Sequence, residues 1–255
     1  MQLLSCLAPG IPASLFEALA DLLDAELSLD ATRSGPDSMD DPFRDGRADL
    51  GWICSTSFAA LGTGADPSVR LVGVGWVPED PDAAGRSVYF SDLVVPADSP
   101  IRSVDDLDGA RVGGNDEISL SGHHALRIEL ARRGHDPDGF ADIVLTGAHH
   151  RSLDQVTGGR LDAAIVDSLV RTARSRHDPA VAGLRVVERL GPWPTQPLVA
   201  RADLDDGTVA AVRRALLASD GDPTVRAELD RAAIDCFVPV GADHCDPVVR
   251  ALARV

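Results

Sequence analysis

Hydroxyl, imidazole and carboxylate side chains recur in this sequence where predicted strands end and helices begin. They lie in residues 89–92, 119–123, 147–149 and 164–168. The first turn of a helix has backbone N–H groups without intrahelical partners, and a nearby hydroxyl or imidazole adds another donor. Groups of this kind can hold the oxygen atoms of a small anion, so these four segments are the candidate binding chemistry.

Ser119, Ser121 and Gly122 form the most compact of these groups, and the residues allow two interpretations. The hydroxyls can cap the following helix, or they can grip an oxyanion with the positive helix end behind it. Asp167, at the end of an apolar run, can likewise cap a helix or contact a ligand. His149 in its predicted loop is either a solvated side chain or a donor and acid–base group.

A second polar group precedes another predicted helix and consists of Cys54, Ser55, Thr56 and Ser57. The serines can cap that helix, or the segment can bind an anion. Cys54 is either an inert buried thiol or a thiol activated by the helix N-terminus.

Several cofactor and metal chemistries have no support in the sequence. All 24 basic residues are Arg, so no lysine can form an internal aldimine with pyridoxal phosphate. The motifs GxxxxGK[ST], GxGxxG, HExxH and GxSxG are also missing. Cys236, His244 and Cys245 could form a disulfide or an incomplete metal site, but structural zinc usually has four ligands. We therefore expect neither cofactor nor metal.

The length, composition and net charge of the chain limit its possible architecture and its binding partners. A chain of 255 residues with 44% hydrophobic content can build one large domain or two small lobes. Its formal net charge of -16 argues against nucleic acid and anionic membrane surfaces as partners. A pocket can still bind a small anion, because its local field can oppose the net charge.

Apolar runs alternate with helical patterns along the chain, which predicts an α/β fold with largely parallel strands. Predicted strands cover residues 3–7, 27–30, 71–77, 88–95, 110–113, 143–145, 163–166, 184–187 and 197–200. A capping box at Ser14 and Glu17 predicts a helix to about Asp24. A short capped helix is predicted to start at Ser103 and to end at Gly109. The other predicted helices include residues 123–133, ended by Gly134, and 152–157, 208–218, 224–233 and 247–253.

The order and spacing of the polar segments resemble the periplasmic-binding-protein type II superfamily. Within it the chain is most similar to the phosphate, phosphite and phosphonate solute-binding proteins of ABC transporters. A Ser-Thr-Ser-Gly loop of that family, which holds phosphonate oxygens, matches Ser119, Ser121 and Gly122, with Leu120 in place of the Thr. A Gly-Ser-His element matches His149. The family's Tyr after the loop is replaced by His123, which together with Leu120 suggests a changed ligand.

The resemblance implies two α/β lobes with mainly parallel mixed sheets, joined by a two-strand hinge. Lobe one would comprise residues 1–90 plus 195–255, and lobe two residues 91–194, with the ligand cleft between them. It further implies that Tyr89, Ser91, Asp167 and Trp193 contact a small anionic ligand, together with the serine loops and residues 54–57. From the residues alone, Tyr89 can equally be a core side chain, and Trp193 can be part of a rigid linker. The family expectation is a monomer, with an ABC permease as partner if the protein is exported.

Two classes of function fit this pattern. The first is a binding protein that closes on phosphate, phosphonate or a related oxyanion. The second is a metal-free lyase, dehydratase or synthase on the same fold, acting on a carboxylated molecule with His149, Asp167 and Cys54 as catalytic residues; a cytosolic sensor is a third. Only five residues precede Cys6, so no signal peptide is visible. We expect a cytoplasmic protein as written, or a periplasmic one if the start is trimmed.

Overall fold

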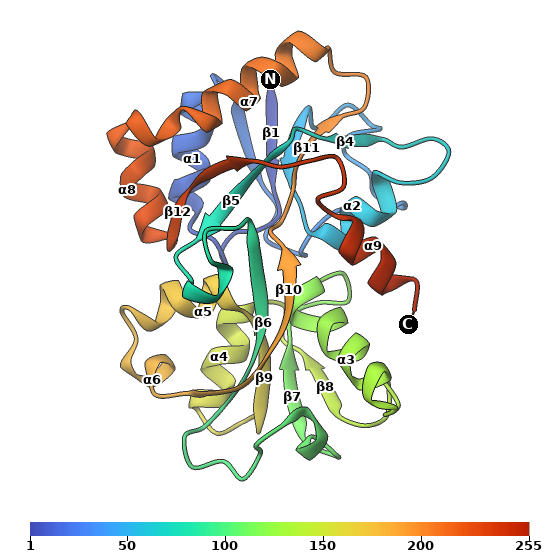
Figure 1. Ribbon diagram of the computed structural model, residues 1–255, viewed down its shortest axis with the longest axis vertical. Coiled ribbons are helices and arrows are strands. Elements are labelled where there is room, and N and C mark those ends of the chain that lie inside the picture. The colour runs from blue at the N-terminus through green and yellow to red at the C-terminus, as the bar shows by residue number, and fades with distance from the viewer. Residues whose placement is uncertain (255) are drawn as a thin grey trace. The chain divides into compact units, whose positions relative to one another are not determined.

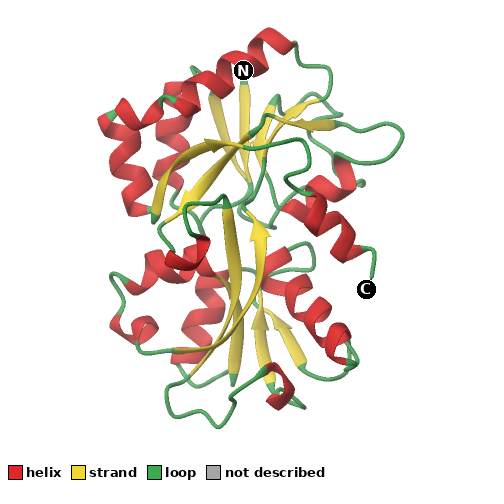
Figure 2. Ribbon diagram, in the orientation of Figure 1, coloured by secondary structure: helices red, strands yellow, loops and turns green. Residues whose placement is uncertain are grey.

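Short apolar strands alternate with helices in two α/β units, seen in a computed structural model that describes residues 1–254. Unit 1 comprises Met1–Val88 and Pro194–Val249. Unit 2 comprises Tyr89–Trp193 and the C-terminal residues from Arg250 onward. Each unit is a sheet with helices packed on it, as the secondary-structure colouring shows (Figure 2).

The main sheet of unit 1 has five strands in the order β2-β1-β3-β11-β4. They are β1 (Gln2–Ser5), β2 (Glu26–Leu29), β3 (Leu50–Trp52), β4 (Val69–Leu71) and β11 (Leu198–Arg201). Strand β1 pairs in parallel with β2 and β3, whereas β11 runs antiparallel to β3 and β4. The antiparallel β11 comes from the distant second segment of the unit, which makes this sheet mixed.

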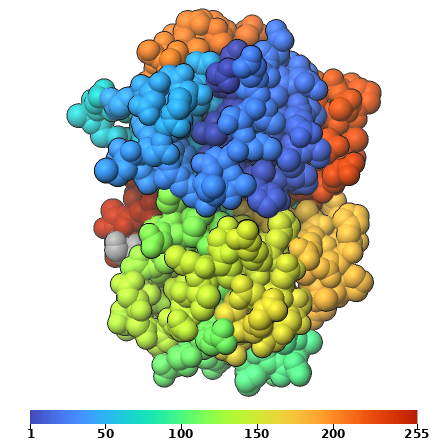
Figure 3. Space-filling view, turned by 180° about the vertical axis from the view of Figure 1, so that it is seen from behind, coloured from blue at the N-terminus to red at the C-terminus, as the bar shows by residue number. Residues whose placement is uncertain are grey.

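A two-stranded antiparallel sheet completes unit 1, formed by β5 (Val74–Pro78) and β12 (Ile234–Pro239). The helices are α1 (Ala13–Leu22), α2 (Ser55–Leu61), α7 (Asp206–Leu217), α8 (Pro223–Arg231) and α9 (Asp246–Leu252), of which the residues from Arg250 belong to unit 2. Trp52 stacks on Trp76 with ring centroids 6.1 Å apart, and Phe16 and Phe237 pack against Trp52. The N-terminal part of the chain covers much of the face of this unit seen in Figure 3.

Unit 2 contains a second five-stranded sheet in the order β10-β6-β9-β7-β8. Its strands are β6 (Val88–Val95), β7 (Arg111–Gly114), β8 (Asp142–Leu145), β9 (Ala163–Asp167) and β10 (Arg185–Pro194). Strand β7 pairs in parallel with β8 and β9, and β6 is antiparallel to β9. The helices are α3 (Ala125–Arg133), α4 (His149–Thr157), α5 (Ser168–Ser175) and α6 (Pro179–Ala182).

Helices cover both faces of the unit 2 sheet, with α3 on one side and α4 on the other (Figure 1). Along β9, Ala163 and Ile165 pack with the α3 core, while Ala164 and Val166 pack with the α4 core. This alternation is the two-residue period of a strand buried on both faces.

A buried ionic trio adds to the core of unit 2. The carboxylate of Asp92 on β6 is fully buried, and its two oxygens accept from Arg171 Nε at 2.6 Å and Arg189 Nε at 2.8 Å. The Arg189 guanidinium also lies 4.3 Å from the centre of the Phe90 ring.

Several sequence predictions agree with these elements. Gly134 ends α3 with a φ of 84°, a left-handed conformation that glycine adopts without strain. A capping box is present at Ser103 and Asp106. Among residues 1–254, no helix combines the length and hydropathy needed to cross a membrane.

Two predictions about elements are wrong, and one strand was not predicted. The capping box at Ser14 and Glu17 is not formed: α1 begins after Pro12 without a side-chain cap, and the Ser14 hydroxyl donates to Glu228 instead. The predicted helix at 152–157 begins three residues earlier, at His149. Residues 234–239, which carried no predicted element, form β12, because β5 supplies a pairing partner from a remote part of the chain.

Candidate functional site

The Ser119–Gly122 turn of unit 2 is organised by its own hydrogen bonds. Ser119 Oγ accepts from the Gly122 N–H at 3.0 Å, so this hydroxyl caps the turn, which is one of the two interpretations that the sequence allowed. Asp116 Oδ1 accepts from the N–H groups of Ile118 and Ser119 at 2.9 and 2.8 Å. A π-helical turn over Leu120–His124 then leads into α3. With Ser119 engaged, Ser121 is the hydroxyl of this turn left for other partners.

Gly122 is required by close packing rather than by its backbone angles. A Cβ at this position would lie 2.5 Å from Asn115 Cβ and 2.9 Å from His149 Cε1, closer than real Cβ contacts. The Gly122 carbonyl also accepts from the Asn115 N–H at 2.8 Å. The glycine therefore brings the turn against both Asn115 and the imidazole of His149.

His149 is the first residue of α4 and links Ser121 to the end of β9. Its Nε2 lies 3.5 Å from Ser121 Oγ, and its Nδ1 accepts from the Asp167 N–H, also at 3.5 Å. Both are long hydrogen bonds. Burial of the ring, and then the charge of His150, lower the pKa of His149 to about 3. The imidazole is therefore neutral near pH 7 and carries one N–H.

Asp167 serves as the N-cap of α5. Its Oδ1 accepts from the N–H of Leu169 at 2.8 Å and of Val170 at 3.4 Å, and the residue is only 2% exposed. Ser168, the other possible cap, instead accepts from the Phe90 N–H at 3.1 Å. The carboxylate is thus committed at least in part to the helix, whatever else it contacts.

Ser91 and Tyr89 lie on β6, on the face of the sheet that also carries Asp167. The Cα of Ser91 is paired with that of Asp167, and directly opposed side chains of neighbouring strands share a face. Ser91 is fully buried and its hydroxyl has no hydrogen-bond partner within residues 1–254. Such a group is costly unless another molecule satisfies it. Tyr89 is 1% exposed.

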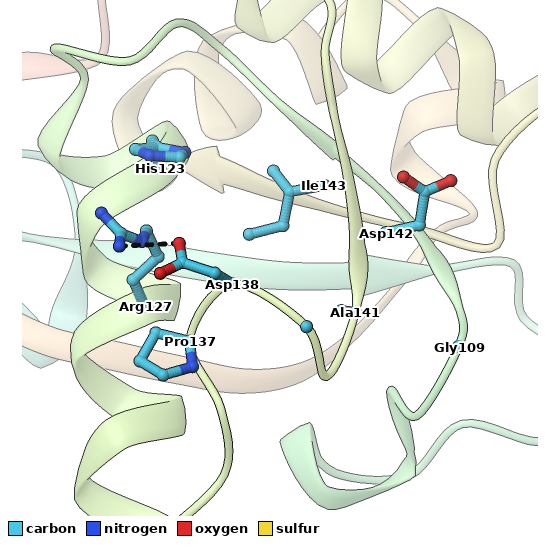
Figure 4. Close-up of a pocket in the computed structure, with 9 residues that line it drawn as sticks. Gly109, His123, Arg127, Pro137, Asp138, Ala141, Asp142 and Ile143 are labelled. Carbon is cyan, nitrogen blue, oxygen red and sulfur yellow. Dashed lines mark ion pairs between the residues drawn. The ribbon is translucent and has the colours of Figure 1, made fainter.

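His123 lies away from this group and lines a separate pocket of about 440 Å³ between α3 and β8. Figure 4 shows its ring above the ion pair of Arg127 and Asp138, whose atoms are 2.7 Å apart. Burial and the charge of Arg127 lower the pKa of His123. Trp193, on β10, is half-buried and packs against the α3 core.

The predicted site residues of unit 1 surround the start of α2. Cys54 is the N-cap but makes no side-chain capping bond, so the prediction of hydroxyl caps on this helix is wrong. Ser57 is 1% exposed and its hydroxyl lacks a hydrogen-bond partner in the described chain. Gly35 packs on it, since a Cβ there would lie 2.3 Å from Ser57 Oγ. Ser55 and Thr56 are also buried.

The cysteines are free thiols, so the alternative of a disulfide between Cys236 and Cys245 is wrong. Cys245 instead packs in the unit 1 core with Cys6 and beside the start of α2. Burial, and then the neighbouring Cys54, raise the pKa of Cys245 to about 12. Cys54 is itself only 4% exposed.

Sequence reasoning missed Asn115 as a residue of the site. Its N–H bonds the Gly122 carbonyl and its carbonyl accepts from the Gly147 N–H at 2.8 Å, so it ties the serine turn to the turn before α4. Its position directly after Gly113 and Gly114, at the end of a predicted strand, is the signal that could have revealed it.

The sequence matches one protein-family profile over residues 8–245: "ABC transporter, phosphonate, periplasmic substrate-binding protein". No curated protein sequence matches the chain. Among solved structures, the binding component of an ABC phosphonate transporter from Pseudomonas aeruginosa superposes with a TM-score of 0.79 and 17% identity. That match covers 99% of this chain and 85% of the other.

Two further structures show the same fold. PhnD1 from Prochlorococcus marinus, in complex with methylphosphonate, has a TM-score of 0.79 and 17% identity, covering 100% of this chain and 98% of its own. The alkanesulfonate-binding protein SsuA from Xanthomonas axonopodis pv. citri, bound to MOPS, has a TM-score of 0.59 and 16% identity, covering 98% and 83%. The predicted fold class is thereby confirmed. The chain belongs to the family of periplasmic substrate-binding proteins of phosphonate ABC transporters.

Proposed function

We propose that this protein binds a small phosphonate-class oxyanion and delivers it to an ABC permease. The observation that carries the proposal is the linked group Ser91, Asp167, His149 and Ser121 in unit 2. Ser91 has a buried hydroxyl without a partner in the described chain, and it lies opposite Asp167 in the pairing of β6 with β9. The neutral imidazole of His149 contacts both the Asp167 N–H and the Ser121 hydroxyl. A tetrahedral oxyanion accepts hydrogen bonds from donors of this kind.

Both units contribute to binding in this proposal. Unit 2 supplies the linked group with Tyr89, the Ser119–Gly122 turn and Trp193. Unit 1 supplies Cys54, Ser55, Thr56 and Ser57, where the unsatisfied Ser57 hydroxyl is the strongest support. His123 has weaker support, because it lines the pocket beside Arg127.

The ligand class follows from the chemistry of these groups and from the relatives. PhnD1 was solved with methylphosphonate and SsuA with the sulfonate buffer MOPS. No arginine is among the side chains assigned to this site, so hydrogen bonds rather than ion pairs would hold the ligand. A periplasmic location, a permease partner and a monomeric state complete the proposal, and they rest on the family.

Thermal unfolding with a panel of ligands tests the proposal: phosphate, phosphite, methylphosphonate, methanesulfonate and an aromatic carboxylate. A ligand at about 100 times its dissociation constant adds about 2.7 kcal/mol of stability, which should raise Tm by about 5–10 °C. Phosphorus NMR of the recovered ligand then shows whether it is unchanged. A carboxylate that stabilises the protein and is consumed would instead indicate an enzyme.

The Ser121→Ala variant tests the named site. Loss of a hydrogen bond to a charged ligand should weaken binding by about ten- to a hundredfold in isothermal titration calorimetry. Ser175→Ala is the matched control, because this α5 hydroxyl bonds only to the Thr172 carbonyl in the described structure. Equal affinities of the two variants would remove Ser121 from the site.

A further inference from the structure

We infer that residues 34–36 form a movable cover over the Ser57 hydroxyl and so control when the unit 1 part of the proposed site binds its ligand. The inference rests on the proposed function and adds a regulatory element to that same site. It follows from a hydroxyl that the ligand uses and that a neighbouring segment of unit 1 shields. The cover consists of Ser34, Gly35 and Pro36.

Two contacts hold the cover against the start of α2. The Ser34 carbonyl accepts from the Cys54 N–H at 3.1 Å. A Cβ added to Gly35 would lie 2.3 Å from Ser57 Oγ and 3.0 Å from Ser57 Cβ, so only a glycine lets the backbone approach this closely. All three cover residues are buried, whereas residues 31, 32 and 38–40 on either side of them are exposed.

The covered hydroxyl has neither a partner nor access to water. Ser57 is 1% exposed, and its Oγ has no hydrogen-bond partner in the described chain. A buried polar group without a partner is costly, and a ligand oxygen cannot reach this one unless a neighbouring group moves. Ile53 and Phe58, which lie on either side of this segment, belong to the apolar core of unit 1, so the cover is the neighbour that can move.

The flanks of the cover are held by charged side chains at the surface. Arg33, directly before it, pairs with Asp37 at 3.1 Å and with Asp40 at 2.6 Å. Arg47 pairs with Asp40 as well. The side chains of Asp37, Asp40 and Arg47 are between 40% and 55% exposed, and ion pairs of such exposure contribute little to stability. The cover can therefore leave Ser57 without a large loss of free energy.

The cover thus has two arrangements of similar free energy, one closed and one open. The closed arrangement has the bond between Ser34 and Cys54 and the ion pairs of Arg33, but it leaves the Ser57 hydroxyl unpaired. The open arrangement loses these contacts and exposes the hydroxyl to water or to a ligand oxygen. The apparent affinity of a ligand that needs the open arrangement is reduced by the open fraction, so a change that opens the cover should tighten binding.

Gly35→Ala is the first test, because its Cβ does not fit against Ser57 while the cover is closed. Gly35 does not have a left-handed backbone conformation, so alanine adds no backbone strain of its own. Titration calorimetry with methylphosphonate should give a dissociation constant about three- to tenfold lower than for the wild type. Hydrogen exchange of the Cys54 amide in the unliganded protein should accelerate by a similar factor. Gly221→Ala, whose Cβ meets no atom within 4 Å, is the control.

Arg33→Gln weakens the closed arrangement without adding an atom next to Ser57. Loss of its exposed ion pairs should lower the dissociation constant about two- to fivefold and speed the exchange of the Cys54 amide. Arg231→Gln removes the same charge and an exposed ion pair on α8, and it should change neither quantity. If Gly35→Ala does not fold, Arg33→Gln decides on its own.

The gain in affinity must depend on Ser57. In a Ser57→Ala background, Gly35→Ala and Arg33→Gln should no longer tighten binding, because the hydroxyl that the cover shields is gone. A gain that persists without Ser57, or an affinity that rises in neither variant, overturns the inference while the binding function stands. Unchanged exchange of the Cys54 amide overturns it whether or not a ligand binds. Failure of every phosphonate and sulfonate to bind overturns the proposed function, and with it the role of the cover in binding.

Discussion

The two units differ in whether the polar groups assigned to the ligand already have hydrogen-bond partners within the protein. In unit 2, Ser119 caps its own turn, Asp167 caps α5, and His149 bonds both Ser121 and the β9 backbone. In unit 1, α2 begins without a side-chain cap, and the buried Ser57 hydroxyl has no hydrogen-bond partner in the described chain. Unit 2 is thus largely organised before a ligand arrives, whereas unit 1 holds a donor that a ligand would satisfy.

This difference reflects how each segment is held. The serine turn of unit 2 is hydrogen-bonded to both Asn115 and Asp116, and Gly122 in this turn packs against the imidazole of His149. The start of α2 packs instead against Gly35 and a core of apolar side chains and thiols. Pre-organised side chains bind a ligand without a further loss of conformational entropy. A buried donor without a partner lowers the stability of the protein until a ligand accepts its hydrogen bond.

The largest expected effect comes from the fully buried carboxylate of Asp92 in unit 2. Asp92→Ala should lower the free energy of unfolding by about 3–5 kcal/mol, because it leaves Arg171 and Arg189 without their buried partner. Urea unfolding measures the change. Asp154→Ala breaks an exposed pair with Arg174 and should cost less than about 1 kcal/mol. Equal costs for the two variants would contradict this account of the unit 2 core.

Gly122→Ala tests how tightly the serine turn is packed. A Cβ there meets Asn115 and His149 within 2.9 Å, so the backbone must shift, at a cost of about 1–3 kcal/mol. Ligand affinity should fall as well, since the turn moves away from His149. Gly221→Ala is the control, because a Cβ at that position meets no atom within 4 Å. A variant with wild-type stability would show that the turn is looser than the structure indicates.

A pair of serine variants distinguishes the two units by the sign of the effect. Ser119→Ala removes a capping hydroxyl and should destabilise the unliganded protein by about 1 kcal/mol. Ser57→Ala removes a buried hydroxyl that has no partner, so it should leave stability unchanged or raise it by up to about 1 kcal/mol, while weakening ligand binding. Chemical unfolding with and without ligand measures both. A destabilising Ser57→Ala would mean that this donor is satisfied within the protein.

Acid should weaken unit 2 before unit 1. Burial lowers the pKa of His149 to about 3 and of His124 to about 4, and also lowers that of His123; in unit 1 it lowers the pKa of His244. The unfolded chain binds these protons near pH 6.5 while the folded chain does not, so stability is full above pH 6.5 and declines as the pH falls toward 4.

Hydrogen exchange of the two units at pH 7.5 and pH 5 checks this order of weakening. His124→Asn should reduce the loss of protection in unit 2, with the exposed His177→Gln as control. A uniform loss of protection across both units, or none, would remove the difference in acid sensitivity between them.

Local patterns in the sequence determined much of this protein. Apolar runs determine the positions of most strands, and Gly134 determines where α3 ends. The capping box at Ser103 determines where the helical turn Val104–Asp106 begins. These features depend on residues within one turn or strand, so the sequence contains their cause. The order of the serine, imidazole and carboxylate segments also indicated the family that the profile match establishes.

Only the tertiary structure decided which of those segments meet. The parallel pairing of β7 with β9 and the antiparallel pairing of β6 with β9 place Ser91, His149 and Ser121 around Asp167. The π-helical turn before α3 places His123 in another pocket. The same long-range pairing made residues 234–239 a strand beside β5. A contact between residues far apart in the chain is set by packing and sheet register, and no local sequence pattern carries that information.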